Sequence, residues 1–284
     1  MRVKNVDLSG KSIVITGASN GIGLATAQWL ADMNAQILMV CRNSQKAEEA
    51  KATLSGSGHR VYLADLSRPA EVAAATAQIS SDFRQLDVLI NNAGFMGYPE
   101  RTLTADGLEV TFATNHLAYF GMVDGLLQVL KNAASARIIN VASVVHTTGK
   151  VELDNLQLER DYHSFRAYCR SKAMNVHFTR ELAARLEGTA VTANSLHPGN
   201  ISSGVARTYD TWFRILYWVG TPFLGSPRRG ARTSVYLASS PEVEGVSGAY
   251  YDKLKRAKSA PVDPELQQGL WQKSEEIWRQ HSAG

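Results

Sequence analysis

The sequence of 284 residues is 44% hydrophobic and 20% charged, a composition typical of a soluble globular protein rather than a disordered or fibrous chain. Its net charge of +4 is not gathered into one long basic run of the kind that a nucleic-acid binder often has. We interpret two short clusters, Arg228-Arg229 and Lys253–Lys258, as solvated surface, with weak attraction to an anionic membrane or cofactor as the alternative. The two cysteines, Cys41 and Cys169, exclude a disulfide framework and lack metal-ligand spacing. We therefore expect both to be buried apolar fillers, with no metal site.

The chain begins with a polar segment, Met1–Lys11, that lacks the apolar core of a signal peptide. No stretch approaches the ~20 consecutive apolar residues that a membrane span needs. We therefore expect a cytoplasmic protein without a transmembrane segment.

Six short runs rich in Val, Ile and Leu predict buried β-strands, because they lack the polar alternation of a half-exposed sheet. They are Ser12–Thr16, Gln36–Val40, Val61–Ala64, Val88–Asn91, Arg137–Val141 and Val191–Leu196. Helical segments between them include Ile22–Met33, Gln45–Leu54 and Ala70–Phe83. This order predicts the α/β class: a single-domain Rossmann-type doubly wound parallel sheet with helices on both faces. Ligands of such sheets bind beyond the carboxyl ends of the strands.

A glycine-rich turn follows the first predicted strand, in the stretch from Thr16 to Gly23. A strand, a glycine turn and a helix together place a pyrophosphate on the helix N-terminus. Gly17 would permit the tight turn, Gly21 a close backbone approach, and Gly23 helix–strand packing. The spacing differs from G-x-G-x-x-G, so an ordinary βα turn is the alternative. The candidate dinucleotide contacts here are Gly17, Ser19, Asn20, Gly21, Ile22 and Gly23.

The second predicted strand is followed by Arg42 and Asn43, with no acidic residue from Val40 to Asn43. An acid at this place would bind the ribose hydroxyls of NAD, whereas an arginine accommodates the 2′-phosphate of NADP through its planar fork. We therefore predict NADP(H), with NAD(H) as the alternative. The competing interpretation is that Arg42 only caps a solvated strand end.

The third and fourth predicted strands also end in polar residues. Asp65, followed by Leu66, could accept a hydrogen bond from the adenine amino group, or could cap the helix that starts near Pro69. Asn92, Ala93 and Gly94 suit a backbone that passes close to a ribose, or a turn held by asparagine side chains.

Three polar residues beyond the fifth predicted strand indicate acid/base chemistry. Tyr168 and Lys172 lie four positions apart in a predicted helix, His163–Leu186, so they share one helix face. A neighbouring ammonium lowers the pKa of a tyrosine from about 10, which lets it exchange a proton near neutral pH. Ser143 would hydrogen-bond the reacting oxygen. The Tyr-x-x-x-Lys spacing alone also fits a surface pair, but together with the glycine turn it favours a nicotinamide-dependent oxidoreductase.

With these motifs the sequence resembles the short-chain dehydrogenase/reductase family, and in particular its retinol dehydrogenase and WW-domain oxidoreductase branch. The resemblance covers nearly the whole chain. It rests on Thr16-Gly17 with Gly21-Ile22-Gly23, Asn91-Asn92-Ala93-Gly94, Asn115 in Thr114-Asn115-His116, Ser143, Tyr168 with Lys172, and Pro198-Gly199. The branch is suggested by Tyr168–Glu181, Asn194–Gly199 and Thr233–Gly248. The membrane anchor at the N-terminus of many branch members and the WW module are not seen.

The resemblance implies a role for each catalytic residue. Tyr168 would be the general acid in reduction and the base in oxidation, and Lys172 would lower its pKa and bind the nicotinamide ribose. Ser143 would orient the substrate oxygen and stabilise developing charge. Asn115 would help to hold a water in a proton relay behind Lys172.

The resemblance also implies contacts after the sixth predicted strand. Further cofactor contacts are expected at Pro198, Gly199, Ile201 and Ser203, although the family commonly has Thr where Ser203 stands. One domain, residues 1–284, would then comprise a cofactor half, about 8–142, and a catalytic and substrate half, about 143–284, with a lid over about 203–227.

The lid is rich in aromatic residues, which suits a hydrophobic carbonyl or alcohol such as a retinoid, steroid, lipid aldehyde or aromatic ketone. The candidate pocket residues are Met96, Val145, Trp212 and Phe213. His146 could line the pocket too, although we expect it at the surface of its loop. The aromatic segment also fits a subunit interface or a peripheral membrane contact.

Two other functions are weighed. A regulator could bind NADPH without turnover, but an intact set of Asn115, Ser143, Tyr168 and Lys172 argues against it. A basic protein of nucleic-acid or membrane surfaces is suggested only by charge, and we expect no nucleic-acid partner. The sequence leaves a homo-oligomer open.

Overall fold

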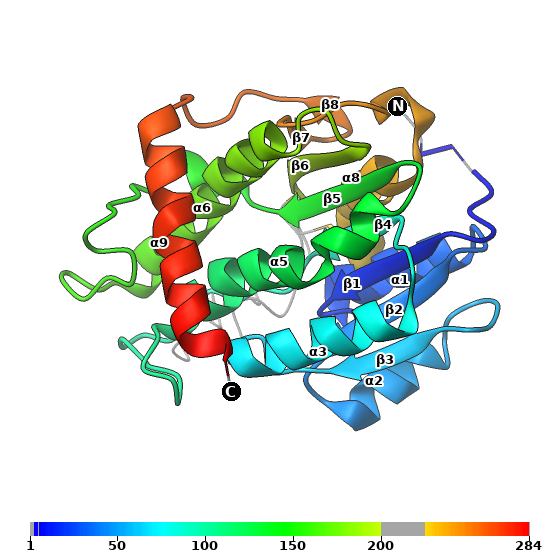
Figure 1. The fold of residues 1–284 in the computed structure, drawn as a ribbon, viewed down its shortest axis with the longest axis horizontal. Helices are drawn as coiled ribbons and strands as arrows, with labels where there is room; N and C mark the ends of the chain where they lie inside the picture. The colour runs from blue at the N-terminus through cyan, green and yellow to red at the C-terminus, as the bar shows by residue number, and fades with distance from the viewer. Residues whose placement is uncertain (1–2, 5, 200–224, 284) are drawn as a thin grey trace.

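The computed structural model describes residues 3–4, 6–199 and 225–283. Within them one sheet contains eight strands in the order β3-β2-β1-β4-β5-β6-β7-β8 (Figure 1). The strands are β1 (Ser12–Thr16), β2 (Gln36–Cys41), β3 (Arg60–Leu63), β4 (Val88–Asn91), β5 (Ala136–Val141), β6 (Val191–His197), β7 (Tyr250–Asp252) and β8 (Lys255–Arg256). All neighbours are parallel except the β7–β8 pair, which confirms the predicted doubly wound α/β sheet.

The strand order reverses between β1 and β4. The chain first adds β2 and β3 on one side of β1, then crosses to β4 on the other side. At such a reversal the loops after the two strands diverge and leave a crevice at their carboxyl ends. The glycine turn after β1 and the Asn92 turn after β4 both lie at this edge, so the topology alone brings two predicted cofactor segments together.

Helices cover both faces of the sheet (Figure 1). The described helices are α1 (Gly21–Ala31), α2 (Ser44–Lys51), α3 (Pro69–Asp82), α4 (Val110–Phe112), the π-helical turn η1 (Ala113–Leu117), α5 (Ala118–Lys131), the 3-10 turn η2 (Val144–Thr148), α6 (Ser164–Arg185), α8 (Pro227–Ser239), the 3-10 turn η5 (Pro241–Val243) and α9 (Pro264–Ser282). One face carries α1 packed on α8, and the other carries α3, α5 and α6 with α9 lying across them.

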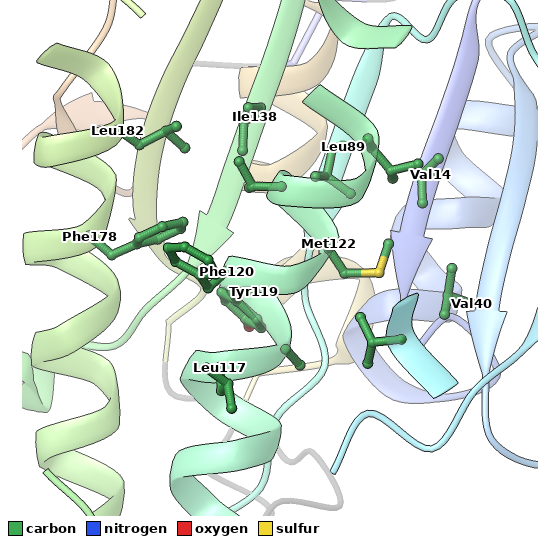
Figure 2. Packing of buried hydrophobic residues seen from close by; sticks show 14 of the residues in the cluster. Val14, Val40, Leu89, Leu117, Tyr119, Phe120, Met122, Ile138, Phe178 and Leu182 are labelled. Carbon is green, nitrogen blue, oxygen red and sulfur yellow. The ribbon is translucent and has the colours of Figure 1, made fainter. Parts of the chain in front are cut away.

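The alternation of strand side chains divides the core in two. Val14 and Val40 point toward α3 and α5, whereas Ile13 and Met39, their neighbours along the strands, point toward α1 and α8. Figure 2 shows the larger cluster, in which Val14, Val40, Leu89 and Ile138 of the sheet face Leu117, Tyr119, Phe120, Met122, Phe178 and Leu182 of the helices. Strands buried on both faces explain why the sequence runs lack polar alternation.

The predicted elements agree closely with the structure. The bounds of β1 and β4 are as predicted, and the other four predicted strands differ by one residue at one or both ends. Cys41 and Cys169 are buried and free, as expected. Arg228 and Arg229 are exposed, and within the other basic cluster the short edge strand β8 is exposed too. The sequence analysis did not predict β7, β8, η1 or α9.

No helix in the described ranges is both long and apolar enough to cross a membrane.

Helix α9 docks through Trp278, whose ring lies over Gly121 in the first turn of α5. A Cβ at Gly121 would overlap that ring, and the ring is fixed because Trp278 Nε1 donates to Asp124 Oδ2 at 3.0 Å. We expect Gly121→Ala to lower the free energy of unfolding by ~1–3 kcal/mol, because overpacking outweighs the better helix propensity of alanine. Denaturant titration measures the change, with exposed Gln128→Ala on the same helix as control. Stability equal to or above wild type in Gly121→Ala would contradict this docking, and Trp278→Leu should lessen the cost of the alanine.

Candidate active site

The glycine turn after β1 has the conformation that its residues predicted. Gly17 and Gly21 have φ of +67° and +55°, in the left-handed region that favours glycine. A Cβ at Gly23 would overlap the carbonyl oxygen of Gly17 and lie 2.6 Å from Nδ2 of Asn92. Gly23 therefore permits α1 to pack against both turns at the crevice, which matches the helix–strand packing predicted for it.

The N-terminus of α1 has the properties of an anion site. Its N-cap residue, Asn20, makes no side-chain cap hydrogen bond, and the first turn of the helix contains no acidic residue. A Cβ at Gly21 would meet nothing within 4 Å, so the space beside the turn is open. The N–H groups of the first turn and the positive end of the helix dipole fit a pyrophosphate here.

The turn after β4 is locked onto β1 by Thr16 and Asn92. The backbone N–H groups of Asn92 and Ala93 donate to Thr16 Oγ1 at 2.9 and 3.0 Å, and Asn92 Nδ2 donates to the Thr16 carbonyl at 2.9 Å. This confirms the interpretation of a turn held by an asparagine side chain. The contact of this turn with a ribose stays a prediction.

Arg42 and Asp65 lie beside each other after β2 and β3. Arg42 is 77% exposed, and its Nη1 lies 3.6 Å from Asp65 Oδ2. Asp65 Oδ1 accepts hydrogen bonds from the backbone N–H and the hydroxyl of Ser67. Burial alone would raise the pKa of Asp65, but the Ser67 hydrogen bonds and the Arg42 charge prevail and lower it. An exposed pair of this kind is weak, so the guanidinium can turn toward a phosphate.

The side chains of Asp65 and Asn43 accept hydrogen bonds from backbone N–H groups, Asp65 in a turn and Asn43 at a helix N-terminus. The capping role considered for Asp65 is wrong, because the N-cap of α3 is Arg68 and the Asp65 carboxylate instead bonds Ser67 and pairs with Arg42. Asn43, predicted as a cofactor contact, caps α2 by accepting a hydrogen bond from Lys46 N at 2.9 Å. Leu66 is half-buried and packs against the larger core cluster.

Lys172 is buried on α6 close to Tyr168. Its Nζ donates to the carbonyl of Val141, at the end of β5, at 3.0 Å. The same atom lies 5.7 Å from the ring centroids of both Tyr168 and Tyr119. Burial lowers the pKa of Lys172 to about 7. The structure therefore brings the predicted Tyr168 and Lys172 together at the carboxyl end of β5.

Ser143 follows β5 by two residues and is buried at the start of η2. Its Oγ accepts a hydrogen bond from Val145 N at 3.5 Å. Because Val141 holds Lys172 and Ser143 continues the same strand end, the serine and the Tyr168–Lys172 pair lie at one edge of the sheet.

Asn115 lies in the π-helical turn η1, a widened turn that often occurs at functional sites. Its side chain bonds the backbone N–H and carbonyl of Phe95 at 3.0 and 2.9 Å and donates to Ser171 Oγ at 3.0 Å. A Cβ at Gly94 would lie 3.2 Å from both Asn115 Oδ1 and Lys172 Nζ. Asn115 and Lys172 thus converge on Gly94, and the water relay between them stays a proposal.

The sequence analysis missed Tyr119, whose ring lies close to the Lys172 ammonium. Tyr119 is buried, and its hydroxyl donates to the Ala93 carbonyl at 2.9 Å. Burial, and then the charge of Tyr168, raise the pKa of Tyr119 well above its usual value, so it remains a neutral donor. Tyr119 lies four residues after Asn115, and this helical spacing could have revealed it.

The expectation that His146 lies at the loop surface is wrong. His146 is 2% exposed, and its Nδ1 lies 2.6 Å from the Ser143 carbonyl oxygen. Its ring packs 4.5 Å from the ring of Tyr250 on β7. The error has a physical reason, since β7 lies about a hundred residues further along the chain and was not predicted.

Of the other residues beyond the glycine turn that are predicted to contact cofactor or substrate, four lie in the part of the chain that the structure describes and four do not. Met96, Val145, Pro198 and Gly199 are half-buried at this edge of the sheet, and Gly199 has a φ of +91°. Ile201, Ser203, Trp212 and Phe213 lie outside the described residues, as does the lid from 203 to 224. Of the described side chains, no three from His, Cys, Asp and Glu are grouped so as to hold a metal ion.

Comparisons with known proteins identify the family of the chain. Residues 11–213 match the family model described as short chain dehydrogenase. The chain is 39% identical to retinol dehydrogenase 14 of Homo sapiens, over 94% of this chain and 86% of that one. It is 41% identical to retinol dehydrogenase 12 of Homo sapiens, over 90% and 82% of the two chains.

Solved structures show the same fold. A protein of Mycobacterium paratuberculosis matches with a TM-score of 0.80 and 28% identity, over 97% of this chain and 96% of that one. A short chain dehydrogenase of Escherichia coli CFT073, solved in complex with NADPH, matches with a TM-score of 0.71 and 20% identity, over 88% and 98% of the two chains. The chain therefore belongs to the short-chain dehydrogenase family, and it is an oxidoreductase that acts on CH–OH groups with NAD(P).

Gly23→Ala tests whether the crevice binds a dinucleotide. The added Cβ must displace the Gly17 carbonyl or the Asn92 side chain, so we expect NADPH affinity to fall at least about tenfold, the equivalent of ~1.4 kcal/mol. Fluorescence titration or calorimetry measures the affinity, and circular dichroism checks the fold. Gln28→Ala, on the same helix, is the control. Unchanged NADPH affinity in Gly23→Ala would show that the dinucleotide does not contact this turn.

Proposed function

We propose that this oxidoreductase is NADP(H)-dependent and interconverts a carbonyl and an alcohol on a hydrophobic small molecule, with Tyr168 as the acid/base. The substrate class is a retinoid, steroid, lipid aldehyde or aromatic ketone. The observation that carries the proposal is the buried Lys172 ammonium, held on the Val141 carbonyl beside the Tyr168 ring. A buried cation at this distance favours the phenolate form of tyrosine over the neutral form.

The proposed mechanism divides the work among three side chains. Tyr168 donates its phenolic proton to the carbonyl oxygen in reduction and takes it back in oxidation. Lys172 keeps the phenolate stable while the proton is away, because the two opposite charges are close in a poorly solvated place. Ser143 donates a hydrogen bond to the same oxygen as charge develops on it. The nicotinamide, when bound, supplies or accepts the hydride.

Asn115 and Tyr119 hold this arrangement in place. Asn115 fixes the backbone at Phe95 and the hydroxyl of Ser171, next to Lys172 in the chain. Tyr119 fixes the carbonyl of Ala93 in the turn after β4. These contacts limit the movement of the loop and helix that face the proposed nicotinamide position, which supports orientation of the two reactants.

The preference for NADP(H) is supported by Arg42. Its guanidinium is exposed at the carboxyl end of β2, and its contact with Asp65 is long and solvated. A 2′-phosphate would offer a charge-assisted, bidentate partner that this arginine lacks in the described residues. NAD(H) is the alternative.

The hydrophobic substrate is supported by side chains beside the catalytic residues. Val144, next to Ser143, is 50% exposed, and Phe165, one helical turn before Tyr168, is 44% exposed. Tyr98 is exposed as well, and its ring contacts Phe95 at 5.8 Å between centroids. Exposed apolar groups around a polar centre suit an apolar ligand. The relationship to retinol dehydrogenases agrees with this class of substrate.

Two further points stay proposals from the sequence. A cytoplasmic location is tested by cell fractionation. The aromatic segment 209–223 forms a substrate lid in our proposal, with a subunit interface or a peripheral membrane contact as alternatives that sedimentation and vesicle binding would reveal.

The function is tested by NADPH and NADH oxidation with a panel that includes retinal, steroid ketones and aromatic ketones. Turnover with NADPH preferred supports the proposal and ranks the substrates. Tight NADPH binding without turnover across the panel would instead favour a cofactor-binding regulator.

Tyr168→Phe removes the proposed acid/base and keeps the ring. We expect kcat to fall by about 10²–10⁴-fold, with the dissociation constant for NADPH nearly unchanged. Tyr236→Phe removes another hydroxyl, which is bonded to Glu242 away from the site, and should keep full turnover. Retained turnover in Tyr168→Phe would show that another group exchanges the proton.

Arg42→Asp tests the cofactor preference. A charge-assisted hydrogen bond contributes ~1.5–3 kcal/mol, so the ratio of kcat/KM for NADPH over NADH should fall by about 10–100-fold. Lys131→Asp, at the exposed C-terminus of α5, makes the same change of charge and should leave the ratio unchanged. An unchanged ratio in Arg42→Asp would mean that a different basic residue binds the 2′-phosphate.

A further inference from the structure

The peptide group between Ser143 and Val144 is held at both of its polar atoms by histidines. Its carbonyl oxygen, on Ser143, lies 2.6 Å from Nδ1 of His146. Its N–H, on Val144, donates to Nδ1 of His197 at 3.2 Å. Both imidazoles are buried, and they come from η2 and from the last residue of β6. One peptide group beside the proposed catalytic serine is thus fixed from two elements.

The partners of the two rings determine their tautomers. A carbonyl oxygen only accepts, so Nδ1 of His146 carries a proton, and its Nε2 then accepts from the backbone N–H of Ala260 at 3.1 Å. A backbone N–H only donates, so Nδ1 of His197 is unprotonated and the proton of the neutral ring is on Nε2. The two histidines therefore have opposite tautomers, and each uses its unprotonated nitrogen as an acceptor.

The contact between His146 and Ala260 connects the serine to α6. Arg180 of α6 donates to the carbonyl oxygens of Ala260 and Pro261 at 2.7 and 2.9 Å, and to Ser259 Oγ at 2.6 Å. The segment 259–261 is thus fastened to the helix that carries Tyr168, and through His146 to the backbone of Ser143. This bridge limits the movement of Ser143 relative to α6.

Burial, with the positive charges nearby, favours the neutral forms of the two rings. Arg180 and His177 of α6, His197 of β6 and Tyr250 of β7 face His146; Asp252, Lys253 and His146 face His197. Burial lowers the pKa of both rings, and Asp252 opposes this only in part at His197. Protonation of His197 would place an N–H opposite the N–H of Val144, and that hydrogen bond would be lost. Protonation of His146 would do the same to its hydrogen bond from Ala260.

We propose that His146 and His197 are positioning residues that orient Ser143 through the Ser143–Val144 peptide group. When protonated at acidic pH, His197 releases the N–H of Val144 and His146 releases Ala260, although His146 Nδ1 still donates to the Ser143 carbonyl. The inference rests on the role of Ser143 in the proposed function. Neither histidine touches substrate or cofactor in this scheme. The oxidoreductase then loses turnover on the acid side of the ordinary histidine pKa of about 6.5, while its fold and its dinucleotide site persist.

The tautomers provide a test that needs no activity. In ¹⁵N-histidine-labelled protein at pH 7, two-bond N–H correlations should show His146 protonated at Nδ1 and His197 at Nε2, with His146→Gln and His197→Asn used for assignment. The same tautomer in both rings, or a doubly protonated His197, would overturn the proposal.

Variants of His197 test the consequence for catalysis. His197→Asn places an amide oxygen near the position of Nδ1, and this amide does not titrate. We therefore expect kcat to stay within about threefold of wild type at neutral pH and to decrease less than that of wild type at acidic pH. His197→Leu removes the acceptor, and kcat should fall about tenfold or more, the equivalent of one hydrogen bond of ~1.4 kcal/mol. The dissociation constant for NADPH should not change in either. His177→Leu, a buried neighbour whose Nδ1 has no partner among the described residues, is the control.

Ser143→Ala distinguishes failure of the proposed role of Ser143 from failure of the positioning role of the histidines. If the histidines act through Ser143, the double variant Ser143→Ala with His197→Leu should have a kcat within about twofold of Ser143→Ala alone. Full turnover in Ser143→Ala would show that the proposed role of Ser143, and the positioning role with it, is wrong. Loss of turnover in Ser143→Ala with wild-type turnover in His197→Leu, or independent effects in the double variant, would overturn the positioning role alone.

Discussion

The arrangement of Ser143, Tyr168 and Lys172 depends on one buried hydrogen bond, from the Lys172 ammonium to the Val141 carbonyl at the end of β5. A buried ammonium is costly unless it is well partnered, so this bond fixes the register of α6 against the sheet. Tyr168 and Ser171 lie within one helical turn of Lys172, and Ser143 lies two residues beyond Val141. A single contact thus fixes the groups that the proposed reaction uses, and burial of the same ammonium makes its charge effective on Tyr168.

The crevice at the carboxyl ends of β1 and β4 results from the sheet topology and from close packing of α1. The reversal between β1 and β4 brings the two turns into contact, and Thr16 and Asn92 join them through three hydrogen bonds. Gly23 then permits α1 to approach both turns. The result is an uncapped helix N-terminus beside an open space, which a dinucleotide can enter without displacing a protein group. The short-chain dehydrogenase family, to which the chain belongs, uses NAD(P).

Much of the fold was predictable because its signals are local. Strands buried on both faces produce short apolar runs, and these predicted β1, β2, β3, β4, β5 and β6 within a residue at each end. The short strands β7 and β8 have no such run. Helix α9 is amphipathic, but its place across α5 and α6 depends on Trp278 lying over a glycine, and neither residue indicates the other in the sequence. Asn115 was found through family resemblance, whereas its bonds to Phe95 and Ser171 require the tertiary fold.

The sequence by itself determined two local motifs, a glycine turn after a strand and a tyrosine and a lysine four residues apart, since both are set by backbone geometry over a few residues. Only the tertiary structure decided how polar side chains without such a pattern are used. Asp65 holds a turn instead of capping α3, and His146 is buried instead of exposed, because its partners Tyr250 and Ala260 come from segments about a hundred residues away. Contacts over such distances are set by packing of the whole sheet, which no short stretch of sequence encodes.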